Sequence, residues 1–336
     1  MMIYVQRYRD SRIPFESTFP VWELTLRSDE NAKESPLGHF TSEIPSPPEK
    51  IWIQGREDAL SILAHAQQVG LAIVGTRAPQ ERVLQLIQNT LGELRASQLI
   101  IVSGFARGVD AAAHTGALQV GLKTIAILGT ALHRRYPVSH HDFLRKQILE
   151  SGGLILSEVN QDAPQMEFQF LRRNRLIAAF TRATWIGQAA ERSGALNTAE
   201  WAGRLGRPLF VTPCFPGDPF LAGNQRLLSE THARPIFSAS CLSSVWLELL
   251  SPSPVKPRLE KRKKNPPPLN QKNNLSLQLE GFIREETMKQ GGVDLFALQS
   301  VFCTGAVAYP DFFKCLQSLL SEGIIKEKGG FLHYHE

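Results

Sequence analysis

The stretch 71–129, LAIVGTRAPQERVLQLIQNTLGELRASQLIIVSGFARGVDAAAHTGALQVGLKTIAILG, decides the fold of this chain. It holds three short apolar runs, at 71–75, 99–104 and 124–129, which are separated by longer segments. In the first of these segments, 80–95, apolar residues recur at helical spacing. Strands as uniformly apolar as these are buried on both faces, as in a parallel sheet covered by helices.

The alternation of strands and helices continues beyond this stretch. Further strands are predicted at 51–55, 153–158, 183–188 and 207–212. Further helices are predicted at 56–69, 109–120, 139–151, 172–180 and 195–205. Such alternation is typical of a sheet with helices on both faces. We therefore expect an α/β fold, a Rossmann-like doubly wound parallel sheet over residues 51–250, with ligands bound beyond the carboxyl ends of its strands.

Three regions flank this core. Residues 1–50 show little periodicity and form a poorly defined N-terminal extension. Residues 251–274 form a basic, Pro-rich linker, and its KRKK run could touch nucleic acid or merely be solvated. Residues 275–336 predict three helices and then two strands around a Gly-Gly turn, the pattern of a C-terminal winged-helix domain. Because acidic residues outnumber basic ones there, we favour a protein contact over DNA binding for this domain.

Positive charge is concentrated in the centre of the chain. The formal net charge is +5, and residues 71–240 carry 18 basic residues, 16 of them arginine, against 12 acidic ones. Arginine offers a planar fork for phosphate oxygens and a flat face that stacks on bases. An anionic partner is one interpretation, and a solvated arginine-rich surface is the other.

Cysteine usage and hydropathy bear on the compartment. The chain has 4 cysteines, which are far apart in the sequence and form no CxxC pair. This pattern is typical of reduced thiols and predicts neither disulfides nor a zinc site. No run approaches the roughly 20 apolar residues of a membrane span, and the N-terminus has no apolar signal segment. We expect a cytoplasmic protein.

Three glycine-containing turns follow predicted strands, at 74–77, 103–110 and 191–198. Each exposes backbone N–H groups at the start of a helix, which is a common place for an anion to bind. Arg77, Arg107 and Arg192 lie in these turns. Because the carboxyl ends of parallel strands meet at one edge, the three turns together predict a phosphate-binding rim, although each glycine alone could serve only the turn.

A fourth basic element is FLRRNRL at 170–176. Asn174 could cap the start of a helix while the arginines reach outward. Basic residues next to aromatic ones, here Phe170, are typical of surfaces on which single strands stack. Alternatively, the phenylalanine is a core residue and the arginines pair with acids such as Glu158.

Motifs of common enzymes are missing from the sequence. There is no GxxxxGKS or GxxxxGKT phosphate loop, no GxGxxG after the first strand and no GxSxG nucleophile turn. The histidines have no acidic partners at ligand spacing. We therefore expect no catalytic residues, no cofactor and no metal.

Several motifs, in this order, resemble those of the DNA-processing protein A family, DprA, also called Smf: LAIVGTR, LIIVSGFARGVDAAAHTGAL, KTIAILGTAL followed by YP, GLILSE, FLRRNRLIAAFTR and AAERSGALNTAEWAGRLGRPLF. The resemblance covers about 71–237. It implies a Rossmann-like core that binds single-stranded DNA, forms a homodimer and helps load the recombinase RecA during natural transformation. The chain departs from the family at Phe170–Leu171, where Phe-Pro is usual, and at Pro213–Cys214, where Pro-Gly is usual.

The resemblance and the turns together give a set of candidate DNA-binding residues. They are Gly75, Thr76, Arg77, Ser103, Gly104, Arg107, Phe170, Arg172, Arg173, Asn174, Arg175, Arg192, Ser193 and Gly194. We expect the arginines to supply charge, and the backbone N–H groups at 75–77 and 193–195 to hold individual phosphates.

Two rival functions remain open. The turn at 193–200, SGALNTAE, is similar to a motif of phosphoribohydrolases that cleave nucleotide N-glycosidic bonds, with Glu200 in the position of the catalytic acid. The chain lacks the Pro-Gly-Gly that precedes that motif. The other rival is an interaction scaffold whose arginines contact an acidic protein.

Overall fold

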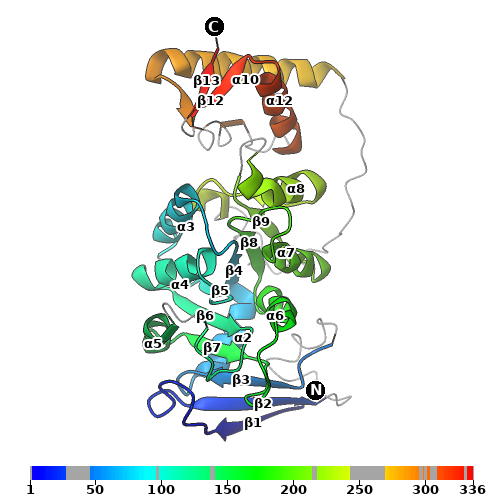
Figure 1. Cartoon of the computed structure of the whole chain (residues 1–336). Coiled ribbons are helices and arrows are strands. Elements are labelled where there is room, and N and C mark those ends of the chain that lie inside the picture. The colour runs from blue at the N-terminus through cyan, green and yellow to red at the C-terminus, as the bar shows by residue number, and fades with distance from the viewer. Residues whose placement is uncertain are drawn as a thin grey trace.

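The computed structural model of this chain describes residues 2–27, 46–95, 98–136, 141–213, 218–242, 269–294, 298, 301–302, 309–328 and 331–335. Its centre is a ten-stranded sheet with the strand order β1-β2-β3-β7-β6-β5-β4-β8-β9-β10 (Figure 1). A separate three-stranded sheet lies near the C-terminus.

Seven neighbouring strands of the large sheet are parallel. They are β7 (Leu154–Ser157), β6 (Lys123–Leu128), β5 (Ile100–Ser103), β4 (Gly70–Val74), β8 (Ala183–Ile186), β9 (Leu209–Val211) and β10 (Arg234–Pro235). Apart from the short edge strand β10, almost every residue of these strands is buried, which is why their sequences are continuous apolar runs. The predicted α/β fold with a mostly parallel sheet is confirmed.

Helices cover both faces of the sheet (Figure 1). On one face lie α2 (Ala59–Val69), α6 (Phe168–Ala179) and α7 (Ala195–Arg204). The short helix η2 (Pro219–Leu221) and α8 (Ala222–Glu230), which follows it in the chain, pack on the same face. On the other face lie α3 (Glu81–Glu93), α4 (Val109–Gln119) and α5 (His141–Glu150).

The chain reverses its direction of travel across the sheet between β4 and β8. It first runs outward through β4, β5, β6 and β7, and β8 then pairs with the other side of β4. Loops that leave β4 and β8 therefore lead to helices on opposite faces. In doubly wound sheets this switch point, at the carboxyl ends of the strands, is where ligands bind.

Residues 1–50 contribute two strands that the sequence did not predict, β1 (Met2–Tyr8) and β2 (Val21–Arg27). They run antiparallel and join the sheet through β3 (Lys50–Gln54), which pairs antiparallel with β7. The apolar pattern of β2 is interrupted by Glu23, which is buried because Lys50 Nζ at 2.7 Å and Trp52 Nε1 at 3.1 Å donate to its carboxylate.

The C-terminal region has a core of its own. It contains α10 (Leu269–Gln290), β11 (Val293–Asp294), α12 (Tyr309–Ser321), β12 (Ile325–Lys328) and β13 (Phe331–Tyr334), with the sheet order β11-β13-β12. The predicted linker 251–274 was too long, since its last six residues belong to α10. Its remainder, including KRKK at 261–264, lies outside the described residues. In the described parts of the chain, no helix is both long and apolar enough to cross a membrane.

A buried arginine joins the N-terminal strands to the parallel sheet. Arg145 of α5 donates from Nε to Gln54 Oε1 at 2.9 Å and from Nη1 to the carbonyl oxygen of Leu132 at 2.6 Å. The amide of Gln54 in turn donates to the carbonyl oxygen of Pro14 at 2.7 Å. Burial lowers the pKa of Arg145 to about 9, so the guanidinium stays charged at neutral pH.

We predict that Arg145→Ala lowers the free energy of unfolding by about 3 kcal/mol, because buried acceptors on Gln54 and Leu132 lose their donor. Lys146→Ala is the matched control on the same helix. Its side chain is 54% exposed, and we expect a change within about 0.5 kcal/mol. Urea unfolding followed by circular dichroism measures both, and equal effects would contradict the assigned role.

Candidate nucleic-acid interface

The loops after β4 and β8 are tied together at the switch point. The N–H of Gly187 donates to the carbonyl oxygen of Val74 at 2.9 Å, and that of Thr76 donates to the carbonyl oxygen of Gln188 at 2.8 Å. A Cβ at Gly75 would lie 2.7 Å from a methyl carbon of Val109, at the start of α4. Only glycine fits at this position, and the two loops and α4 pack as one unit.

The turn between β5 and α4 closes on the same place. Gly108 has a φ of +77°, and a Cβ there would lie 2.4 Å from the carbonyl oxygen of Thr76. The N–H of Val109 donates to that same oxygen at 3.1 Å. Phe105 also has a positive φ, of +61°, and its side chain is buried. The turn is therefore held against residues 75–77 by close backbone contact.

A buried carboxylate organises these loops. Asp110 Oδ2 accepts hydrogen bonds from the N–H groups of Gly104 at 3.1 Å and Ala106 at 3.3 Å, and the N–H of Gly75 also faces the carboxylate. Burial raises the pKa of Asp110, while the nearby Arg173 and the three N–H groups act against that rise. The N–H of Thr76 is bonded to Gln188 and that of Gly75 faces the Asp110 carboxylate, so the expectation that they hold phosphates does not fit them.

The RRNR segment lies inside α6, not at its start, because the helix begins at Phe168. Arg173 is 5% exposed and donates to the carbonyl oxygens of Gly104, at 2.6 Å, and Ile127. Burial lowers the pKa of Arg173 to about 10. Asn174 does not cap the helix, since its amide donates to the carbonyl oxygen of Gly194 at 3.2 Å. These two side chains join α6 to neighbouring loops instead of reaching outward.

Arg175 is buried in an ion pair with Glu158, at 2.6 Å, and both side chains are about 5% exposed or less. Arg172, in contrast, is 55% exposed, with its Nε 3.6 Å from the same carboxylate. The structure therefore gives the arginines of this segment different environments. Of the three, Arg172 alone presents its guanidinium to solvent.

The remaining candidates also divide into buried and exposed groups. Ser103 is buried, and its hydroxyl donates to the carbonyl oxygen of Ile73 at 2.6 Å. The N–H of Ser193 donates to the carbonyl oxygen of Ala190 at 3.1 Å, and that of Ala195 donates to the Ser193 hydroxyl at 3.3 Å. Both N–H groups are therefore satisfied within the turn. Arg107, Arg192 and Gly194 are exposed.

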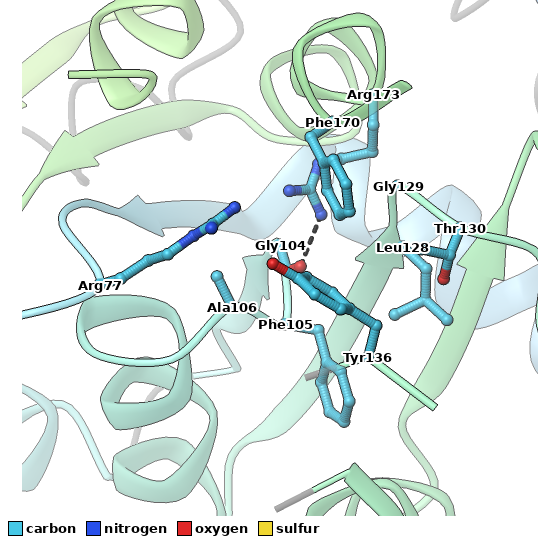
Figure 2. Close-up of a pocket in the computed structure, with 10 residues that line it drawn as sticks. All are labelled: Arg77, Gly104, Phe105, Ala106, Leu128, Gly129, Thr130, Tyr136, Phe170 and Arg173. Atoms are coloured by element: carbon cyan, nitrogen blue, oxygen red, sulfur yellow. Dashed lines mark hydrogen bonds between the residues drawn. The ribbon is translucent and has the colours of Figure 1, made fainter. Parts of the chain in front are cut away.

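A small hollow of about 20 Å³, room for little more than a water molecule, opens between β5, β6 and α6 (Figure 2). Arg77 points toward it, and its guanidinium carbon lies 5.9 Å from the ring centres of both Tyr136 and Phe170. The two rings are 5.2 Å apart. A Cβ at Gly129 would lie 2.6 Å from the Phe170 ring, so the ring packs directly on the backbone after β6.

Tyr136 was not among the candidate DNA-binding residues, although its tyrosine-proline pair is part of the motifs that resemble the family. It follows β6 in the chain. Together, Arg77, Tyr136 and Phe170 form a cation–π cluster at the carboxyl edge of the sheet, which places a charge beside aromatic rings of the kind that stack on nucleobases.

We define the arginine rim as the exposed Arg77, Arg107, Arg172 and Arg192, which follow β4, β5, β7 and β8 at the carboxyl edge. Glu200, the candidate acid of the rival enzyme, lies on α7 and pairs at 2.5 Å with Arg204, with both side chains 56% exposed. This is an ordinary pair on a helix surface. Among the described residues, no group of acidic, histidine or cysteine side chains could hold a metal ion.

A family model described as DNA recombination-mediator protein A matches residues 31–246. The chain belongs to this family. It is 38% identical over 174 residues to the Smf protein of Synechocystis, and this alignment covers 52% of the chain and 43% of the relative. The match thus spans less than half the length of that relative.

Two solved structures of DprA proteins share the fold. DNA processing protein A from Streptococcus pneumoniae is 32% identical with a TM-score of 0.56, and the match covers 68% of this chain and 74% of that one. The protein from Helicobacter pylori is 30% identical with a TM-score of 0.55, covering 67% and 96%. The latter structure was described for its single-stranded DNA binding mode.

We predict that Arg175→Ala destabilises the fold by about 3 to 5 kcal/mol, because it leaves the buried carboxylate of Glu158 without its main partner. Arg172→Ala, three residues away and exposed, should cost less than about 1 kcal/mol. Equilibrium unfolding in urea distinguishes the two. Equal and small effects would show that Arg175 is not held in the core as described.

Proposed function

We propose that this chain binds single-stranded DNA along the arginine rim and has no catalytic chemistry of its own. The observation that carries this is the cluster of Arg77 with Tyr136 and Phe170 at the carboxyl edge, flanked by the other exposed arginines. Membership of the recombination-mediator family and the DNA-binding relative from Helicobacter pylori support it.

In the proposed interface, exposed residues contact the DNA and buried residues hold the loops in position. The exposed arginines attract the phosphates, and this attraction reads little sequence. Bases are left outward or stack on Arg77, Tyr136 or Phe170. Gly75, Gly104 and Gly108 hold the loops close together, while Ser103, Arg173, Asn174 and Arg175 fix their positions from inside the domain.

The proposed selection of single strands over duplex rests on which bases can reach the aromatic rings. Tyr136 and Phe170 line the small hollow beside Arg77 at the edge of the sheet. A paired backbone holds its bases inside the helix and cannot present them to Tyr136 or Phe170. A single strand can turn its bases toward these rings.

For the cellular role we propose DNA processing in natural transformation, in the cytoplasm, with protection of incoming single strands and loading of RecA for homologous recombination. A homodimer through the Rossmann-like domain belongs to the same proposal. These statements rest on family membership. The relative from Streptococcus pneumoniae is named for DNA processing, and it is similar to this chain over 68% of the chain.

We assign residues 275–336 to a winged-helix domain that contacts protein. The order α10, β11, α12, β12, β13 and the three-stranded sheet agree with that pattern, and residues 298, 301 and 302 are helical. In the proposed division, residues 1–50 extend the core at 51–250, 251–268 connect the core to the C-terminal domain, and 269–274 extend that domain as the first residues of α10. The excess of acidic residues in the C-terminal domain argues against phosphate binding there.

The phosphoribohydrolase remains a second candidate on the strength of the turn at 193–200 alone. The exposed pair of Glu200 with Arg204 does not favour it, since a general acid needs a sheltered environment near the substrate. Assay of Glu200→Gln for cleavage of nucleoside monophosphates tests it directly.

We predict that Arg77→Ala weakens single-strand binding about tenfold, because the change removes one phosphate contact and the cation of the aromatic cluster. Fluorescence anisotropy with a labelled oligonucleotide across a salt series measures this, and the log–log salt slope should fall by about one unit. Arg204→Ala is the control, since Arg204 is a similarly exposed arginine at the far end of α7. Equal losses of affinity in both variants would show that Arg77 is not part of the DNA-binding interface.

We also predict that a duplex of the same length binds at least about tenfold more weakly than the single strand at 150 mM salt, because its bases cannot reach the rings. Tyr136→Phe should keep this preference, while Tyr136→Ala should reduce it. Comparable affinities for the two forms in the wild type would contradict the stacking argument.

A further inference from the structure

Backbone N–H groups from two strand ends face one carboxylate at the switch point. Gly104 and Ala106, after β5, donate to Asp110 Oδ2 at 3.1 and 3.3 Å, and the N–H of Gly75, after β4, faces the same carboxylate. Asp110 is 4% exposed. We call these three N–H groups the cradle.

The partners of Asp110 distinguish it from an ordinary helix cap. An acidic residue in the first turn of a helix commonly bonds N–H groups of that same turn. Asp110 is in the first turn of α4, but its partners lie before the helix and across on the neighbouring strand. Asp110 therefore holds two loops together and does not merely cap the start of α4.

The guanidinium of Arg173 adds positive charge beside the cradle. It donates to the carbonyl oxygen of Gly104 at 2.6 Å, as Figure 2 shows, and a Cβ on Gly104 would lie 2.5 Å from one of its nitrogens. Arg173 and Asp110 are both buried and attract one another. Converging N–H groups, a nearby cation and glycines that admit close approach are the components of a phosphate site in doubly wound folds.

We propose that the Asp110 carboxylate is an internal anion that occupies the phosphate position of this cradle and closes it to free phosphate and mononucleotides. Ligand phosphates are then contacted by the arginine rim outside the cradle. Several separated arginines suit a polymer that carries many phosphates better than a single nucleotide. This last step rests on the proposed function, whereas the occupancy of the cradle does not.

Removing the carboxylate should convert the cradle into an open anion site. Asp110→Ala keeps Cβ and leaves a space that formate, which is a bare carboxylate, can fill. We expect the melting temperature of Asp110→Ala to rise saturably with formate by about 3 °C or more beyond its rise in chloride of equal ionic strength. The wild type and Asp110→Asn, in which the space stays filled, should show no such excess in formate.

The comparison among variants makes the result specific to an anion position. A purely structural role for Asp110 predicts loss of stability in Asp110→Ala without formate dependence, and that outcome would overturn the proposal. If the variant does not fold in chloride, refolding in formate should recover it, and failure in both solutions would also overturn the proposal. Absence of DNA binding by the wild type would contradict the proposed function but not the occupancy of the cradle, because the formate response is measured without DNA.

Discussion

The contacts of the Asp110 carboxylate with the loops after β4 and β5 are the constraint on which the edge of this sheet depends. They draw Gly75, Gly104 and Ala106 to one point, and the glycines allow the backbones to approach that closely. Arg77 and Arg107 follow directly in these loops. Their positions at the surface therefore depend on a buried carboxylate that lies against both loops, and rigid placement of surface charge favours binding.

Arginine plays two opposite roles in this molecule. Arg145, Arg173 and Arg175 are buried and donate to carbonyl oxygens, to an amide or to a carboxylate, so they act as internal hydrogen-bond donors. Breaking such buried contacts leaves acceptors without water or partner, which is costly. The rim arginines have little of this role, and the positive charge available to a ligand comes from them. The formal net charge of the chain is therefore a poor measure of the positive charge that the arginine rim presents to a ligand.

The parallel sheet could be predicted because buried strands impose continuous apolar runs, and residues 71–129 show three of them. The strand β2 could not, because Glu23 interrupts its apolar pattern. Glu23 is buried through an ion pair with Lys50 and a hydrogen bond from Trp52, partners that only the fold brings together. The RRNR segment shows the same limit. The sequence of the segment does not distinguish the buried Arg173 and Arg175 from the exposed Arg172. Their burial depends on carbonyl oxygens and a carboxylate that come from distant loops.

The candidate turns were correctly placed at one edge of the sheet, but the mechanism assigned to them changes. Their N–H groups are largely bonded within the chain, so side chains and rings carry the contact with DNA in our proposal. Ultraviolet cross-linking of the full chain to an oligothymidylate, followed by peptide mapping, tests this most directly. We predict cross-links in the peptides that contain Tyr136 and Phe170, and cross-links confined to residues 269–335 would contradict the account.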